Sequence, residues 1–455
     1  MQPVDCLLAL SAALLSQVPS AHPTEPSLRA WGRALRPAPD LNGDGIDEFT
    51  FLSVAELAED SVKEARYRVA SGATARTLWR DRSGMLGFDL GGGLVFGNGD
   101  AGESLVALLG VNNVDGGRAV RVSTDVDLEY MVNAPAHKDL AIDITRQPSP
   151  GTFQAAVGFS GASPYLYLMS LDPRRSSGTL SMLDIERGRW TALAGPSRFG
   201  ENHSFFALLP GNSLHACSEQ GSAPPVVVGY LQESIPGSYA VAFAEYAFGS
   251  SAPRGAVEIA ISSGVVPASA ARLDVDGRRL VAIGCPRART GPASEQSPDH
   301  IKAAGEVVLV DLSDGEVIQR VMDAELAASW REGGQDAEFG AAVGLFQVGQ
   351  RIGVVVGVPG FAAQPSVRAY WADTGHLIWS FEECGLSRGS MFEQLGRDLI
   401  VLNSSAEPRV VMRGFCRDEA ASLICIGAVS GKEIWTVSAP SAELEQYEAS
   451  GADER

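Results

Sequence analysis

A nine-residue segment near the start of the chain has the composition and spacing of a loop that binds a hard cation. Residues 40–48 are Asp-Leu-Asn-Gly-Asp-Gly-Ile-Asp-Glu, with oxygen side chains at loop positions 1, 3, 5 and 9 and glycine at position 6. Ca²⁺ takes about six to eight oxygen ligands, and alternate residues of a tight loop can supply them. We therefore expect a Ca²⁺ site here. Its predicted ligands are the side chains of Asp40, Asn42, Asp44 and Glu48 and the carbonyl of Ile46.

Three alternatives remain open for this loop. Asp47 could close the ligand shell in place of Glu48. An EF-hand also begins Asp-x-Asn-x-Asp-Gly, and residues 55–65 have a helix-forming composition, but position 12 of the loop is Phe51. An EF-hand needs a bidentate Glu at that position. The third alternative is a surface turn rich in Asp and Asn that holds no ion.

The bulk composition indicates a folded, turn-rich protein that does not bind nucleic acid. The 455 residues are 45% hydrophobic and 20% charged, which is enough apolar material for a sizeable core. The 50 Gly and 25 Pro residues suit many short strands joined by turns. The formal charge is −19, and no run of Lys and Arg interleaved with aromatic residues offers a surface for a phosphate backbone.

The two ends of the chain are predicted to lie outside the folded domain. Residues 1–21 have the pattern of a signal peptide, with an apolar stretch from 6 to 15 and small residues before a cleavage point after Ser20 or Ala21. Residues 1–5 carry no Lys or Arg, so a buried strand or a misassigned start codon remain alternatives. We expect export to the periplasm, the cell surface or the extracellular space, without a transmembrane anchor. Residues 441–455 form an acidic tail that we expect to be disordered.

The cysteines argue against a zinc site. Six cysteines occur, and none of them forms a Cys-x-x-Cys motif. Cys416 and Cys425 flank a polar turn and could form a disulfide across a hairpin in an exported protein. Buried free thiols are the alternative.

Similar segments recur along the chain. Three of them share a Gly, an Ile three residues later and a final Trp or its substitute, and their last residues lie 60 and 56 residues apart. The three segments are Gly315-Glu-Val-Ile-Gln319, Gly375-His-Leu-Ile-Trp379 and Gly431-Lys-Glu-Ile-Trp435. Trp79 ends a similar unit 240 residues before Gln319, which implies about seven units.

Each unit is predicted to contain four short antiparallel strands. Strands ending in Gly-x-Pro at residues 284–286 and 357–359 precede the shared endings, and Phe339-Gly340 opens a further unit. Sheets of this kind bury their faces by stacking radially, as in a β-propeller. We therefore predict an all-β fold, a seven-bladed β-propeller of four-stranded antiparallel blades over residues 22–440. Residues 40–48 would connect the first two strands of a blade, and residues 98–103 and 274–277 would be decayed copies of that loop.

The combination of Phe-Gly, an Asp-x-Asn-x-Asp-Gly loop and a strand ending in Gly-x-Pro resembles the FG-GAP repeat of the integrin α-subunit N-terminal propeller. The resemblance is strong over residues 270–437, good over 40–82 and weak over 83–269. It implies a seven-bladed propeller with Ca²⁺ in loops on one face. The family's ligand positions correspond to Asp40, Asn42, Asp44, Ile46 and Glu48, whereas most other units lack the metal loop.

Signals for catalysis are weak. The ending at Trp435 is also similar to the tryptophan-docking motif of pyrroloquinoline-quinone dehydrogenases, but no vicinal Cys pair accompanies it. Core anchoring between blades is the simpler interpretation of the Trp residues. Glu201 with His203 and His215 could form an acid–base pair, although surface histidines explain them as well. A hydrolase elbow is absent, because residues 158–161 read Gly-Phe-Ser-Gly.

We therefore expect an exported, calcium-binding β-propeller that acts as a non-catalytic binding, adhesion or scaffold module. It would be a monomer that binds a protein or glycan ligand on a propeller face. The alternative is a quinoprotein-like or hydrolytic propeller enzyme with a site at the central channel.

Overall fold

The computed structural model describes most of the predicted propeller. The described residues are 31–38, 40–58, 61–80, 93–98, 104–114, 117–123, 142–143, 152–160, 163–171, 179–184, 187–195, 204–210, 225–235, 238–259, 261, 267–286, 305–323, 338–359, 366–382, 395–403, 407–415 and 421–439. The predicted signal peptide, the acidic tail and the histidines at 203 and 215 lie outside them. In this part of the chain no helix is long and apolar enough to span a membrane.

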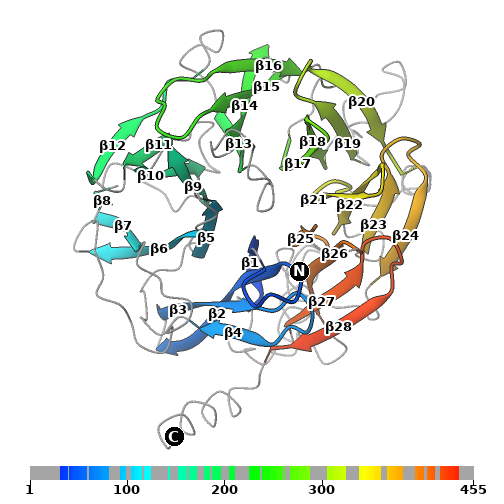
Figure 1. Ribbon diagram of the computed structural model, residues 1–455, viewed down its shortest axis with the longest axis horizontal. Coiled ribbons are helices and arrows are strands. Elements are labelled where there is room, and N and C mark those ends of the chain that lie inside the picture. The colour runs from blue at the N-terminus through cyan, green and yellow to red at the C-terminus, as the bar shows by residue number, and fades with distance from the viewer. Residues whose placement is uncertain are drawn as a thin grey trace, which may run out of the picture.

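Seven antiparallel sheets of four strands stand around a ring, numbered here as blades in chain order (Figure 1). The first strand of each sheet lies near the axis and the fourth at the periphery (Figure 1). Blades 1 to 3 contain β1 (Arg33–Ala38), β2 (Glu48–Ala58), β3 (Ser61–Ala70), β4 (Thr77–Arg80), β5 (Gly93–Asn98), β6 (Ser104–Val114), β7 (Gly117–Ser123), β8 (Ile142–Asp143), β9 (Thr152–Ser160), β10 (Ser163–Leu171), β11 (Thr179–Asp184) and β12 (Arg189–Ala192).

Blades 4 to 7 follow the same order along the chain. They contain β13 (Ser204–Leu209), β14 (Val226–Ile235), β15 (Ser238–Tyr246), β16 (Gly255–Ile259), β17 (Ser269–Val275), β18 (Arg278–Cys285), β19 (Glu306–Asp311), β20 (Glu316–Val321), β21 (Val343–Val348), β22 (Arg351–Val358), β23 (Ser366–Trp371), β24 (Leu377–Glu382), β25 (Leu399–Leu402), β26 (Arg409–Phe415), β27 (Ala421–Gly427) and β28 (Glu433–Ser438).

The prediction of an all-β propeller with antiparallel blades is confirmed, whereas the prediction of seven regular blades is wrong. Six blades have an outer strand of four to six residues. In blade 2 the outer strand β8 has two residues, Ile142 and Asp143, which pair only with Val120 and Ala119 of β7. So short a strand adds few ladder hydrogen bonds. Over the described residues the propeller therefore has six complete blades and one sheet with a rudimentary outer strand, which falls where the sequence repeat is weak.

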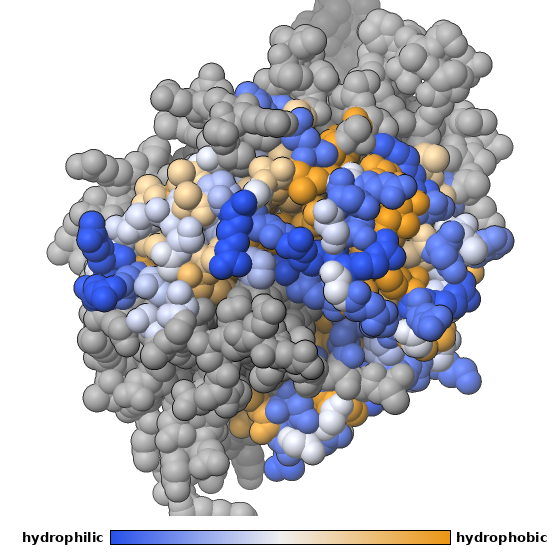
Figure 2. All heavy atoms as spheres, turned by 45° about the horizontal axis from the view of Figure 1, so that its top comes forward, coloured by the Kyte–Doolittle hydropathy of each residue, from blue (hydrophilic) through white to orange (hydrophobic). Residues whose placement is uncertain are grey.

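Apolar side chains fill the spaces between neighbouring blades. One core cluster joins blades 4 and 5 through Phe243 and Ile283, and another joins blades 5 and 6 through Leu309 and Val356. Strand β19 is buried along its whole length, as expected for a strand covered on both faces. On the surface in Figure 2, apolar residues appear in bands between hydrophilic ones and do not form one continuous face.

Two tryptophans of the outer strands, Trp379 and Trp435, anchor their blades to the next, as the sequence predicted. The indole Nε1 of Trp379 donates a hydrogen bond to the carbonyl of Ala428 in the following blade (2.7 Å). Its ring lies against Gly431, where an added Cβ atom would be 2.6 Å from Cγ of Trp379. Gln319, the Trp substitute, approaches Gly375 in the same way. The repeated Gly and Trp are thus two halves of one contact between blades.

The turn between β3 and β4 offers a stability test, because an alanine occupies a glycine position. The amide of Ala75 bonds back to Ser71 as Gly431 does to Gly427, and both residues have positive φ (60° and 64°). A left-handed conformation destabilises a residue with a Cβ atom by about 1–2 kcal/mol, and replacement by glycine removes this strain. The greater flexibility of glycine in the unfolded chain offsets about 0.4–1 kcal/mol of that gain. Ala75→Gly should therefore raise the free energy of unfolding by up to about 1 kcal/mol, measured by urea denaturation.

Ala73→Gly is the matched control in the same turn, because Ala73 has no positive φ. It should lower stability by about 0.4–1 kcal/mol. If both substitutions destabilised the protein equally, backbone strain at Ala75 would be refuted.

The two ends of the propeller meet between blade 7 and blade 1 without sharing a strand. All four strands of blade 1 come from residues 33–80, and all four of blade 7 come from residues 399–438. Strands β1 and β25 are neighbours at the centre of this seam (Figure 1). In the described residues, side-chain and loop contacts therefore close the ring, and no strand pairs across the seam.

Candidate metal centre

The loop of residues 40–48 connects β1 to β2 at the start of blade 1. Ala38 pairs with Glu48, so the strands bring the two ends of the loop together. Gly43 and Gly45 have φ angles of 77° and 80°, which an L side chain adopts only with strain. The residues that follow form strand β2 and not a helix, so the EF-hand alternative is wrong.

Asp40 organises the loop backbone. Its Oδ1 accepts hydrogen bonds from the amides of Gly43 (2.8 Å) and Asp44 (3.2 Å), and its Oδ2 accepts one from Gly45 (2.7 Å). Three amides on one carboxylate compensate its negative charge and fix the turn. The side chain predicted as the first ligand thus also holds the loop in shape.

Asn42 and Asp44 complete the turn from its exposed side. Oδ1 of Asn42 accepts from the amide of Asp44 (2.8 Å), and Oδ1 of Asp44 accepts from the amide of Ile46 (2.9 Å). Nδ2 of Asn42 donates to Oδ2 of Asp44 (3.0 Å). These side-chain oxygens thus bond within the turn itself.

Glu48 is the unusual member of the set, because its carboxylate is buried and only half satisfied. The residue is fully buried (0% exposed), and its Oε2 accepts a weak hydrogen bond from the amide of Gly72 (3.3 Å). Its Oε1 has no hydrogen-bond partner among the residues that the structure describes. Burial, together with the negative charges of Asp44, Asp40 and Asp47, raises the pKa of Glu48 to about 7. A buried carboxylate in such surroundings costs free energy unless a proton or a cation neutralises it.

The predicted ligands share one loop, but they do not form a closed shell. Among the described residues, no three His, Cys, Asp or Glu side chains converge closely enough to hold a metal ion by themselves. The predicted set relies in part on an amide oxygen and a backbone carbonyl, which lie outside that count. The predicted ligand atoms are all oxygen, and one of them is a buried carboxylate oxygen without a hydrogen-bond partner among the described residues. Their chemistry therefore suits a hard cation.

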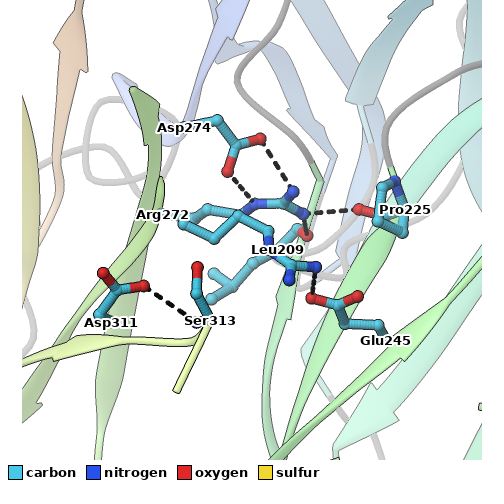
Figure 3. A network of polar contacts seen from close by, with 8 residues as sticks. Leu209, Pro225, Glu245, Arg272, Asp274, Asp311 and Ser313 are labelled. Carbon is cyan, nitrogen blue, oxygen red and sulfur yellow. Dashed lines mark hydrogen bonds and ion pairs between the residues drawn. The ribbon is translucent and has the colours of Figure 1, made fainter. Parts of the chain in front are cut away.

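In blade 5 the corresponding loop is neutralised by arginine (Figure 3). Asp274 accepts two hydrogen bonds from Arg272, at 2.7 and 2.8 Å, and Arg272 also donates to the carbonyl of Pro225 in blade 4 (2.5 Å). Arg279 forms an ion pair with Glu245 of blade 4. Guanidinium groups thus neutralise Asp274 and Glu245 at this junction.

In the described part of blade 1, no such arginine neutralises the carboxylates of Asp40, Asp44 and Glu48. Across the strand pairs, the positions that match Glu48 in blades 5, 6 and 7 are Leu280, Gly353 and Arg409. None of the three places a carboxylate in the blade. In the described chain, no Lys or Arg forms an ion pair with Asp40, Asp44 or Glu48. An acidic side chain at this buried position therefore coincides with the intact acidic loop.

Sequence reasoning missed the partner of Glu48. Gly72 lies in the turn after β3, and its amide is the donor to Glu48 while its carbonyl accepts from Arg409 (2.9 Å) and from Nε1 of Trp435 (3.1 Å). The only signal available was that Gly72 precedes the strand of Trp79 in the first repeat. Contacts between residues 48, 72, 409 and 435 depend on ring closure, which no local pattern encodes.

Glu201, His203 and His215, the possible acid–base group, lie outside the described residues. His376 is exposed, Ser160 ends β9, and Cys285 and Cys425 are free and buried. Because Cys425 is free, the disulfide with Cys416 is not formed; Cys416 itself lies outside the described residues. Burial raises the pKa of the Cys425 thiol to about 12, which makes it a poor nucleophile.

Comparisons with known proteins describe the fold and nothing finer. No protein-family model and no curated protein matches the chain. Among solved structures, a prolyl endopeptidase is 12% identical with a TM-score of 0.45 over 96% of this chain and 55% of its own, so this chain spans about half its length.

Two lectins also match the fold at similarly low sequence identity. The BP39L lectin from Burkholderia pseudomallei is 13% identical with a TM-score of 0.45, over 86% of this chain and 95% of its own. The six-bladed fungal lectin from Aleuria aurantia is 10% identical with a TM-score of 0.39, over 77% and 96%. At these values the matches assign neither a ligand nor an activity.

Proposed function

We propose that this protein is a non-catalytic, calcium-binding β-propeller that acts as a binding or scaffold module. The cation would occupy the loop of residues 40–48, with Asp40, Asn42, Asp44, Glu48 and the carbonyl of Ile46 as ligands. The observation that carries the proposal is the buried Glu48 carboxylate, whose Oε1 has no partner beside three further carboxylates. The resemblance to FG-GAP repeats points in the same direction.

The role of the cation would be structural. A bound Ca²⁺ neutralises the mutual repulsion of Asp40, Asp44 and Glu48 and supplies the missing partner of Glu48. Extracellular Ca²⁺ modules bind with a Kd of about 10⁻⁴–10⁻³ M. At about ten times such a Kd, binding stabilises the folded state by about 1.4 kcal/mol. Such a site fills only where Ca²⁺ is near millimolar, which fits the proposed export.

Calorimetric titration of Ca²⁺ into the chelator-treated full chain tests the site. We expect about one ion per chain with a Kd near 10⁻⁴–10⁻³ M and weaker binding of Mg²⁺, which prefers a smaller octahedral shell. Glu48→Gln and Asp44→Asn should each weaken Ca²⁺ binding at least tenfold, because each removes a charged oxygen ligand.

Asp314→Asn is the matched control, since Asp314 lies in an exposed acidic turn of blade 5 far from this loop. It should leave the Kd unchanged. Absence of Ca²⁺ binding to the unaltered chain, or equal affinity in all three variants, would contradict the proposed site.

The ligand class that we propose is a protein or a glycan, bound on a face of the propeller. The turns that connect the first to the second strand and the third to the fourth strand of blades 1 and 5 to 7 lie at one end of their sheets, and they expose polar side chains such as Asp44, Asp373 and Lys432. Purification from the native extract with Ca²⁺ and with chelator would identify a ligand that is retained only when the loop is loaded.

A further inference from the structure

We propose that a cation bound in the loop of residues 40–48 strengthens the seam between blade 1 and blade 7, so that closure of the ring responds to the cation. This inference rests on the proposed function, because it requires an ion in that loop. Its subject is a different part of the molecule, namely the joint at which the two ends of the propeller meet.

Gly72 connects the loop to the seam through its backbone. Its amide donates to Oε2 of Glu48 on the loop side. Its carbonyl accepts from Nη1 of Arg409, at the start of β26, and from the indole of Trp435 in β28. Arg409 donates in addition to the carbonyl of Ala73 (3.2 Å). One peptide segment thus carries hydrogen bonds to the candidate ligand and to two residues of blade 7.

Gly72 has little freedom to move independently of the loop. A Cβ atom on Gly72 would overlap the carbonyl oxygen of Asp47 and would lie 2.8 Å from Cδ1 of Leu402 in blade 7. The backbone of the loop end and the side chain of Leu402 therefore confine Gly72 from both sides. A shift of Asp47 and Glu48 is transmitted to blade 7, because close-packed groups cannot absorb it locally.

Aromatic side chains provide a second connection. Phe49, which follows Glu48 directly, stacks on Trp435 with ring centroids 5.7 Å apart and planes inclined by 15°. The carbonyl of Trp31, just before β1, accepts a hydrogen bond from Nε of Arg413 (2.8 Å), and the Trp31 ring contacts Phe51 edge-on. The residues that follow the loop therefore form the blade 1 side of the seam.

A modest stabilisation by the cation should matter most at the seam. Among the strands that the structure describes, none is shared across it, so side-chain and loop contacts join blade 7 to blade 1 there. The joint between blades 6 and 7 has the equivalent tryptophan contact, from Trp379 to Ala428 of blade 7, but Arg409 occupies the position of Glu48 in blade 7. The cation should therefore stiffen the seam and leave the neighbouring joint unchanged.

Hydrogen exchange followed by mass spectrometry tests the inference on the full chain, with Ca²⁺ at about ten times its Kd and with chelator. If opening of the seam releases the ion, Ca²⁺ should slow exchange about tenfold in β28 and in residues 71–76. Exchange in β24, the matching strand of blade 6, should change less than twofold. Equal slowing of β24 and β28 would overturn the inference.

Trp435→Phe separates the seam from the site, because it removes the indole donor to Gly72 and keeps an aromatic ring on Phe49. The variant should still bind Ca²⁺ by calorimetry, and the Ca²⁺-dependent slowing in residues 71–76 should fall at least threefold. Ca²⁺ binding with unchanged exchange at the seam would overturn this inference and leave the proposed function standing. Absence of Ca²⁺ binding would overturn both.

Discussion

Gly357→Ala is expected to lower the free energy of unfolding by about 2–3 kcal/mol or more, because the first atom of any side chain would meet backbone. A Cβ atom at this position would overlap the carbonyl oxygen of Gly396 and lie 2.7 Å from its carbonyl carbon. Gly357 is the penultimate residue of β22 in blade 6, and Gly396 precedes β25 of blade 7, so the clash would force the two blades apart. Backbone cannot rotate away as a flexible side chain can. Equilibrium denaturation in urea measures the loss.

Gly255→Ala is the matched control for this prediction. Gly255 begins β16, has no positive φ and has no atom within 4 Å of the position of an added Cβ. The substitution should leave stability unchanged or raise it by about 0.4–1 kcal/mol through the unfolded chain. If Gly357→Ala behaved like Gly255→Ala, the blades would not approach each other as the structure shows.

Asp323→Ala is expected to cost about 3–5 kcal/mol, because it leaves a buried arginine without its counter-charge. Asp323 accepts hydrogen bonds at 2.5 Å from Nη1 of Arg368 and from the hydroxyl of Tyr370. The Asp and Arg side chains are 6% and 10% exposed, so little water can replace the lost partner. Burial and the hydrogen bond to Asp323 raise the pKa of Tyr370, which remains a donor at neutral pH. The shift of the urea midpoint reports the cost.

Two controls separate charge from shape in this network. Asp323→Asn keeps an acceptor of the same size and should cost less than Asp323→Ala. Asp373→Ala removes an exposed partner of Arg351, with side chains 54% and 46% exposed, and should change stability by less than about 1 kcal/mol. A small and equal effect of Asp323→Ala and Asp373→Ala would refute the importance of burial.

The sequence alone determined the elements that are repeated. The recurring Gly and Trp predicted an antiparallel blade unit, and the structure shows why both residues recur: Trp379 lies on Gly431 of the next blade. The loop of residues 40–48 was recognisable because its turn depends on local hydrogen bonds and on glycines at positive φ. Such features are encoded by neighbours in the chain, so spacing is enough to find them.

The sequence could not show where the repeat fails. Blade 2 has an outer strand of two residues, and the count of seven regular blades assumed that the spacing between Trp79 and Gln319 was filled evenly. Strand length depends on pairing with a neighbouring strand as well as on composition. The weak pattern of residues 83–269 was the signal for that irregularity.

Only the tertiary structure decided the environment of the candidate ligand and the closure of the ring. From the sequence, Glu48 is one of several interchangeable carboxylates, with Asp47 as an alternative. In the folded chain Glu48 is buried, lacks a partner for one oxygen and is linked through Gly72 to Arg409 and Trp435. Arg409 and Trp435 lie more than 300 positions after Gly72 in the chain. The burial of Glu48 and the closure of the ring both come from packing between the first and last blades. Local spacing therefore identified the loop, and long-range packing decided which of its carboxylates is buried with an unsatisfied oxygen.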